Sequence, residues 1–168
     1  MGHPLSGNTG FCWLIWVQET ALVIQMRSAG RTACWRRQLY TGSDITMANI
    51  LIIYSTTDGH TREICLRLKQ VIEDAGNQIT LVDVGHSSAI NLGDFDKIVI
   101  GASIRYGKHS PAVYDFVKEN ARVLDSKPNA FFTVNVVARK PEKNTPETNP
   151  YLIKFLKQIA WKPKTLAV

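Results

Sequence analysis

The chain has 168 residues, of which 45% are hydrophobic and 20% charged, a balance typical of one soluble globular domain rather than a disordered or collagen-like chain. Its net charge of +6 and pI near 9.3 suit an anionic partner, whether a membrane surface, a nucleic acid or an acidic small molecule, and charge alone does not choose among them. The three cysteines have neither metal-site spacing nor an even number for disulfides. We therefore expect a reduced cytosolic chain without a metal site.

The first 46 residues differ in composition from the rest. They contain three of the four tryptophans and two of the three cysteines, and we see no alternating strand pattern in them. Their one strongly apolar run, residues 11–24, is too short to cross a bilayer and lacks the basic residues that precede the core of a signal peptide. We interpret Met47 as the natural start and residues 1–46 as an extension that is not part of the fold. An amphipathic membrane anchor is the alternative.

From residue 47 onward, apolar β-rich runs alternate with helical patterns. We predict strands at residues 49–54, 79–84, 97–102, 130–137 and 165–168, and helices at residues 61–75, 111–124 and 150–160. This alternation, with strands as apolar as ILIIY, predicts an α/β fold whose parallel sheet is covered on both faces. In such sheets the ligand binds beyond the carboxyl ends of the strands, so the loops that follow strands are the ones to read.

The first of these loops is rich in hydroxyl groups. It runs Ser55, Thr56, Thr57, Asp58, Gly59, His60, Thr61. It lacks both the G-x-G-x-x-G pattern of dinucleotide folds and the G-K-[ST] pattern of nucleoside-triphosphate loops. A strand that enters a helix through such a loop can wrap a terminal phosphomonoester with backbone amides and Ser or Thr hydroxyls.

The segment around this loop resembles the flavodoxin phosphate-loop signature. An apolar pair (Ile52, Ile53) and an aromatic residue (Tyr54) precede the loop, which ends at the signature threonine Thr61. Where the signature continues with alanine, this chain has Cys65, another small residue that buries well. The resemblance implies a flavodoxin-like doubly wound sheet of strand order 2-1-3-4-5 and FMN as the cofactor.

The second loop follows the strand KIVIGA. We expect it to hold the flavin ring through Ser103, Ile104, Arg105, Tyr106 and Gly107. Tyr106 can stack on the ring, and Gly107 allows the backbone to approach the ring edge. Taken alone, the segment also fits an ordinary connection to a helix that begins at Pro111.

The third loop, residues 138–150, is long, polar and contains three prolines, and a loop of this length is usually functional or disordered. Together, GASIRYG, VNVVARKPEKNTP and the helix that follows resemble the quinone-dependent protoporphyrinogen IX dehydrogenases, FMN-containing relatives of flavodoxin, over about residues 47–168. The resemblance implies further cofactor contacts from Asn135, Val136, Val137 and Ala138. We expect Arg139 and Lys140 to bind the substrate propionates, with arginine the better fork.

The implied activity is oxidation of protoporphyrinogen IX to protoporphyrin IX in haem synthesis, with menaquinone or ubiquinone as acceptor. A candidate rim of five basic residues favours a flavin that accepts electrons: Arg105, Lys108, Arg139, Lys140 and Lys143. For Lys108 and Lys143 a solvated basic surface is the alternative that fits better. We expect no nucleic-acid partner and a cytoplasmic protein peripheral to the inner face of the cell membrane, where later lysines meet anionic lipid. The sequence assigns no catalytic residue, and the oligomeric state stays open. His60 and His109 read as hydrogen-bonding or surface residues.

The chain stops within the predicted last strand. Relative to the resembled family, we expect the closing helix to be missing, which would expose apolar surface. An inactive truncated product is therefore one alternative to the enzyme. A flavodoxin-type electron-transfer protein, which the flavodoxin resemblance also allows, is the other.

Overall fold

A computed structural model describes residues 11–17, 20–26 and 47–168, and the contacts divide the chain into two units between residues 43 and 44. In the first unit, β1 (Phe11–Val17) pairs with β2 (Thr20–Met26) in an antiparallel sheet that runs in register from Phe11 opposite Met26 to Val17 opposite Thr20.

The expectation that residues 11–24 lack strand structure is wrong. The run is rich in aromatic and β-branched residues, which favour strands. β1 and β2 together span this run, which the sequence alone presents as one apolar stretch. Residues 1–10, 18–19 and 27–46 lie outside the described part of the chain, and the interpretation of residues 1–46 as an extension stays a prediction.

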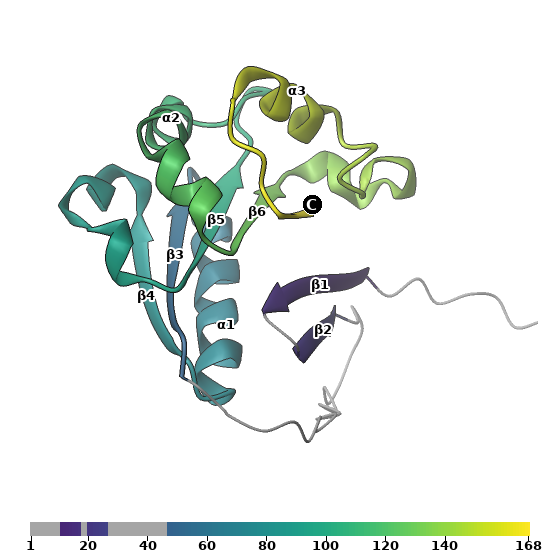
Figure 1. Cartoon of the computed structure of the whole chain (residues 1–168). Helices are drawn as coiled ribbons and strands as arrows, with labels where there is room; N and C mark the ends of the chain where they lie inside the picture. Colours follow the sequence, from purple (N-terminus) through teal and green to yellow (C-terminus); the bar gives the residue numbers. More distant parts are fainter. Residues whose placement is uncertain (1–10, 18–19, 27–46) are drawn as a thin grey trace, which may run out of the picture. The chain divides into compact units, whose positions relative to one another are not determined.

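The second unit alternates strands and helices (Figure 1). Its strands and helices are β3 (Asn49–Ser55), α1 (His60–Asp74), β4 (Gln78–Asp83), β5 (Lys97–Ser103), α2 (Pro111–Ser126), β6 (Asn129–Val134), α3 (Pro150–Gln158) and β7 (Thr165–Ala167). Four short 3-10 helices are η1 (Val84–Ala89), η2 (Leu92–Asp94), η3 (Val136–Arg139) and η4 (Pro141–Lys143). All neighbouring strands are parallel, in the order β4-β3-β5-β6-β7. Counted from β3, this is the predicted order 2-1-3-4-5, and the α/β fold is confirmed.

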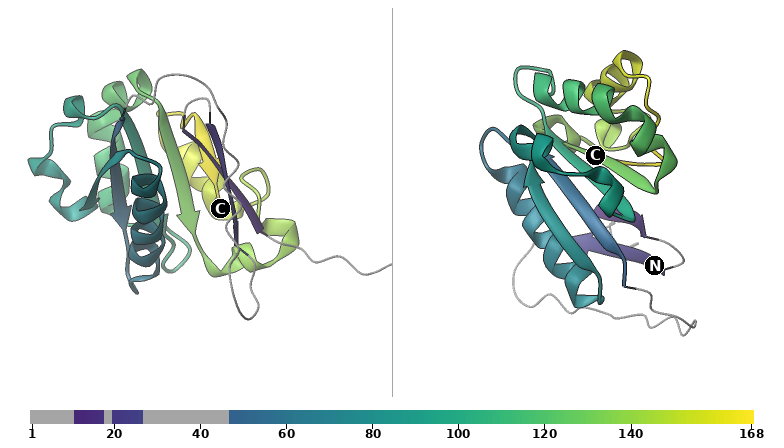
Figure 2. Two further views of the ribbon diagram at one scale, coloured as in Figure 1. Left: turned by 90° about the horizontal axis from the view of Figure 1, so that it is seen from below. Right: turned by 60° about the vertical axis from the view of Figure 1, so that its left-hand side comes forward.

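The central strands are apolar because both faces of the sheet are covered. In β3, all four residues from Ile50 to Ile53 have no exposed surface. Helix α1 covers one face, against β3, β4 and β5, while α2 and α3 cover the opposite face (Figure 2). None of the helices in the described ranges is both long and apolar enough to cross a bilayer.

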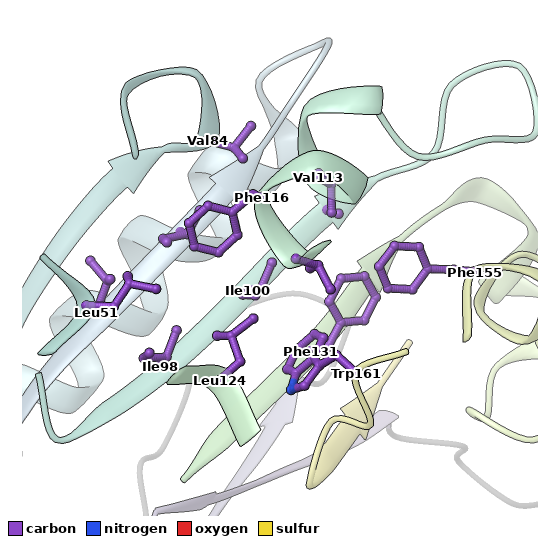
Figure 3. Close-up of a cluster of buried hydrophobic side chains, with 14 of the residues drawn as sticks. Leu51, Val84, Ile98, Ile100, Val113, Phe116, Leu124, Phe131, Phe155 and Trp161 are labelled. Atoms are coloured by element: carbon purple, nitrogen blue, oxygen red, sulfur yellow. The ribbon is translucent and has the colours of Figure 1, made fainter. Parts of the chain in front are cut away.

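The larger part of the core lies on the α2 and α3 face (Figure 3). Phe131 of β6 stacks on Phe155 of α3, with ring centroids 4.6 Å apart, and meets Trp161 edge-on. These rings fix α3 on the sheet, which positions the long loop that precedes the helix.

On the α1 face, the Phe132 ring lies over Gly101 of the neighbouring strand. A β-carbon at residue 101 would overlap this ring. The glycine therefore permits the aromatic side chain to lie across the sheet where α1 does not reach.

The predicted strand at residues 130–137 is too long by three residues. β6 ends at Val134 because Asn135 begins a helical turn, its Oδ1 accepting a hydrogen bond from Ala138 N–H at 3.0 Å. An asparagine that bonds the backbone a few residues ahead competes with the strand ladder.

Candidate functional site

Three loops meet at the carboxyl edge of the sheet. β5 pairs with β3 on one side and β6 on the other, with Ser55 opposite Ala102 and Ser103 opposite Val134. The segments after these strands are the three loops singled out from the sequence. The topology thus brings together residues that are far apart along the chain.

The first loop connects β3 to α1 through four residues. Ser55 is the buried last residue of β3, and Gly59 adopts φ = 87°, a left-handed conformation that suits glycine, immediately before the helix. Gly59 N–H donates to Thr56 Oγ1 at 3.0 Å. Thr57, Asp58 and His60 are exposed. The loop is therefore open to solvent at its tip and anchored at both ends.

Thr61 lies in the first turn of α1 and has no exposed surface, yet its Oγ1 has no hydrogen-bond partner. Buried hydroxyls are nearly always paired, so an orphaned one requires an explanation. The first N–H groups of a helix also lack intrahelical acceptors and carry partial positive charge. A bound anion such as a phosphate would satisfy both sets of donors, so the residues present fit a phosphate group.

The second loop contains a tight hairpin. Arg105 and Lys108 exchange backbone hydrogen bonds of 2.9 and 3.1 Å, and the two residues between them, Tyr106 and Gly107, have φ values of 49° and 74°. Positive φ at both central positions is the geometry of a type I′ turn. The hairpin is fixed to β6, since Ile104 N–H donates to Val134 O at 3.0 Å.

An ion pair joins the first two loops. Arg105 Nη1 lies 2.8 and 2.7 Å from the two carboxylate oxygens of Asp58, and the guanidinium lies 5.1 Å from the centroid of the Tyr106 ring. Arg105 is one of the basic residues expected at the rim of the flavin site. Because the Asp58 carboxylate compensates the charge of Arg105, Arg105 adds less positive potential at the rim than expected.

Two large apolar side chains at this edge are exposed. Tyr106 is 90% exposed and Val136, in the third loop, is 73% exposed; among the described residues the only other such side chain is Met47. Exposed apolar side chains from neighbouring loops suit a planar organic ligand.

The third loop is folded into η3 and η4 rather than lacking structure. Val137 and Ala138 are half-buried, whereas Arg139 and Lys140 are exposed. Sequence reasoning missed the role of Asn149, which has no exposed surface and precedes α3. The signal was present, because an asparagine followed by proline is a common start of a helix.

His109, expected to be a hydrogen-bonding or surface residue, is buried between Phe131 and Phe155. Its Nδ1 lies 3.3 Å from Ser103 O. A carbonyl only accepts, so Nδ1 carries the proton and Nε2, which has no partner, is the acceptor. Burial lowers the pKa of His109 to about 4 against the opposing effect of the Ser103 bond. The imidazole is therefore neutral near pH 7 and supports the hairpin.

No cluster of three or more His, Cys, Asp or Glu side chains suited to a metal occurs within the described residues. The buried Cys65 thiol has its pKa raised to about 12 by burial, so it is a packing residue of α1.

Comparison with known proteins relates this edge to a family. A family model described as a flavodoxin domain matches residues 51–168. The chain is 47% identical over 118 residues to the protoporphyrinogen IX dehydrogenase [quinone] of Escherichia coli K12, covering 70% of this chain and 65% of that protein. It is 42% identical over 119 residues to the protein of the same name from Leishmania major, covering 52% of it. The chain thus spans about half to two thirds of these curated relatives.

Solved structures show the same fold at low identity. Two mutant forms of a flavo di-iron protein from Thermotoga maritima superpose with TM-scores of 0.51 and 0.52 at 15% and 12% identity, covering 71% of this chain and 30% of theirs. These likenesses show the fold alone, whereas the family model covers most of the chain. The chain therefore belongs to the flavodoxin domain family, and this membership implies a flavin cofactor.

Proposed function

We propose that residues 47–168 form an FMN-binding domain that oxidises protoporphyrinogen IX to protoporphyrin IX with a quinone as acceptor. The observation that carries the choice of substrate and acceptor is the 47% identity to a protein named for this reaction. The geometry supports the cofactor, because a phosphate-suited loop and exposed apolar side chains lie at one sheet edge.

Different loops contact different parts of FMN. The amides and hydroxyls of the first loop, with the buried Thr61 hydroxyl, bind the phosphate. Tyr106 and Val136 flank the ring, and the turn at Gly107 keeps the backbone close to it. A bound flavin would supply the redox chemistry, since a flavin can accept a hydride equivalent from an organic substrate and pass the electrons to a quinone.

The substrate binds beside the ring through its propionates. Arg139 and Lys140 are exposed and lie at the end of η3 and just after it, next to the predicted cofactor contacts Val136 to Ala138 in the same 3-10 helix. A guanidinium forms two parallel hydrogen bonds with a carboxylate, so Arg139 is the principal anchor.

Charge reversal tests this anchor. Arg139→Glu should raise the KM for protoporphyrinogen more than it weakens FMN binding, because the side chain lies outside the phosphate loop. Arg122→Glu, an exposed position on α2, is the matched control and should change neither. Equal loss of both affinities in Arg139→Glu would contradict the assignment.

The distribution of charge indicates which part of the chain faces the membrane that carries the quinone. Residues 47–135 contain nine Lys or Arg and ten Asp or Glu, a net charge of −1, whereas residues 136–168 contain seven and two, a net charge of +5. Six of those seven cations are exposed: Arg139, Lys140, Lys154, Lys157, Lys162 and Lys164. Basic surfaces bind anionic lipid, and we propose peripheral contact with the inner face of the cell membrane. Sedimentation with anionic vesicles but not with neutral ones would support it, and equal binding to both would oppose it.

The alternative is a flavodoxin-type carrier that passes electrons between proteins, which the family model alone would favour equally. Anaerobic mixing of FMN-loaded protein with protoporphyrinogen separates the two. Porphyrin fluorescence that appears only when quinone is added supports the enzyme. No fluorescence, with the flavin still reducible by an electron-donor protein, supports the carrier.

A further inference from the structure

The side chain of Asn149 is fully buried and uses both ends of its amide. Its Oδ1 accepts the N–H groups of Tyr151 and Leu152, each at 3.2 Å, and so caps α3. Its Nδ2 donates to Lys143 O at 2.9 Å and to Asn135 Oδ1 at 3.3 Å. One amide therefore joins the end of β6, the third loop and the start of α3.

The two donated hydrogen bonds lie at the two ends of residues 136–143, which we call the basic turn. Asn135 lies immediately before η3 and Lys143 ends η4, so Arg139 and Lys140 lie between the two points that Asn149 holds. In the described structure, the other side-chain hydrogen bonds of residues 140–148 are local ones between Thr145 and Thr148. Ala138 packs on the core and bonds Asn135 Oδ1 at the start of the turn, and the Asn149 amide adds the hydrogen bonds that tie both ends of the turn to the start of α3.

We propose that Asn149 is a positioning residue for the substrate: its donated hydrogen bonds hold the turn of residues 136–143 at the sheet edge, which sets where Arg139 and Lys140 meet an anionic substrate. The inference rests on the proposed function for the identity of that substrate. The cap on α3 is a separate role of the same side chain, performed by the oxygen rather than the nitrogen.

Two substitutions separate these roles. In Asn149→Ser the hydroxyl can still cap α3, but the hydrogen bonds that Asn149 Nδ2 donates to Asn135 Oδ1 and Lys143 O are lost. In Asn149→Ala both the cap and the donors are lost. The matched control is Asn91→Ser. There Oδ1 accepts Gly93 N–H at 3.0 Å and Nδ2 donates to Asp94 Oδ1 at 2.9 Å, at η2, before the opposite end of β5.

The experiment uses the full chain and four readouts. These are hydrogen exchange of the Ala138 amide without added cofactor, the KM and kcat for protoporphyrinogen, the Kd for FMN, and the Tm. We expect both Asn149 variants to accelerate Ala138 exchange about tenfold, equivalent to about 1.4 kcal/mol, and to raise the KM by a similar factor with little change in kcat or in FMN affinity. Asn149→Ala alone should also lower the Tm below that of Asn149→Ser, and Asn91→Ser should leave exchange and KM unchanged.

Two results would overturn the proposal. If Asn149→Ser keeps wild-type exchange and KM, capping accounts for the whole role of the residue. If exchange accelerates while the KM stays constant, the turn does not position the substrate. Failure of the wild-type protein to oxidise protoporphyrinogen would instead defeat the proposed function, and the exchange comparison would still decide whether Asn149 holds the turn.

Discussion

Replacement of Thr61 by valine should stabilise the cofactor-free protein against unfolding and lower its affinity for FMN. Valine has nearly the shape of threonine but lacks the hydroxyl. The Thr61 side chain has no exposed surface and its Oγ1 has no partner within the protein. A hydroxyl that is buried without a hydrogen-bond partner destabilises the folded protein, and a ligand that accepts its hydrogen bond removes this cost.

The two effects have opposite signs and can be estimated separately. A buried polar group left unpaired costs about 1–3 kcal/mol, so its removal should raise the free energy of unfolding of the cofactor-free protein by on the order of 1 kcal/mol. A hydrogen bond to a charged group contributes about 1.5–3 kcal/mol, so its loss should raise the Kd for FMN by about 10- to 150-fold. Helix propensity differs little between the two residues and does not change either sign.

Urea unfolding of the cofactor-free protein gives the first quantity, and quenching of flavin fluorescence gives the second. Riboflavin provides an internal control: it lacks the phosphate, so its affinity should be the same for wild type and Thr61→Val. Thr133→Val is the matched control in the protein, because Thr133 also has a buried hydroxyl without a partner but lies on β6 outside the phosphate loop. It should stabilise the empty protein without changing FMN affinity.

Destabilisation of the cofactor-free protein by Thr61→Val, with an unchanged Kd for FMN, would refute this prediction. The hydroxyl would then have a structural partner and no role with the phosphate. Equal weakening of FMN and riboflavin would show that the valine disturbs the site generally.

Three further predictions concern the loops and the sheet. Asp58→Asn should free the positive charge of Arg105 and shift the reduction potential of bound flavin upward while barely changing the urea midpoint, because exposed ion pairs stabilise little; Asp125→Asn on α2 is the control, and a downward shift would be contrary to expectation. For His109, the folded state has a pKa of about 4 against 6.5 for the free side chain, so the unfolded chain binds more protons between these pH values and stability should fall by up to about 3 kcal/mol as pH drops through that window. His109→Gln should flatten the dependence in urea unfolding, and an unchanged slope would show that other groups cause it. Gly101→Ala should lower the free energy of unfolding by about 1–3 kcal/mol because the new methyl group meets the Phe132 ring; Phe132→Leu should reduce this loss in a double-mutant cycle, and strictly additive effects would argue against the clash.

Much of the second unit could be predicted from the sequence because its signals are local. Runs such as Asn49–Ser55 are continuously apolar, and a parallel strand buried on both faces requires that pattern. The start of α1 after Gly59 and the start of α2 at Pro111 follow from the backbone preferences of glycine and proline. The end of β6 was misjudged because Val136 and Val137 favour strands, whereas the Asn135 side chain diverts the backbone into a turn. The pairing of β1 with β2 was not predicted, although both runs are rich in aromatic and β-branched residues, because which segments pair is not specified by either segment alone.

The sequence by itself determined the order of strands and α-helices in residues 47–168, the hydroxyl-rich loop and the family, since these depend on which residues are neighbours along the chain. Only the tertiary structure decided that the Asp58 carboxylate neutralises Arg105, that His109 is buried and neutral, and that the Asn149 amide bridges Asn135 and Lys143. The Asp58–Arg105 contact joins two loops that a parallel crossover connection brings to one edge of the sheet, and the other two features depend on how α3 packs on β6. Their charges and hydrogen bonds depend on distances of a few ångströms, which residue order along the chain does not specify.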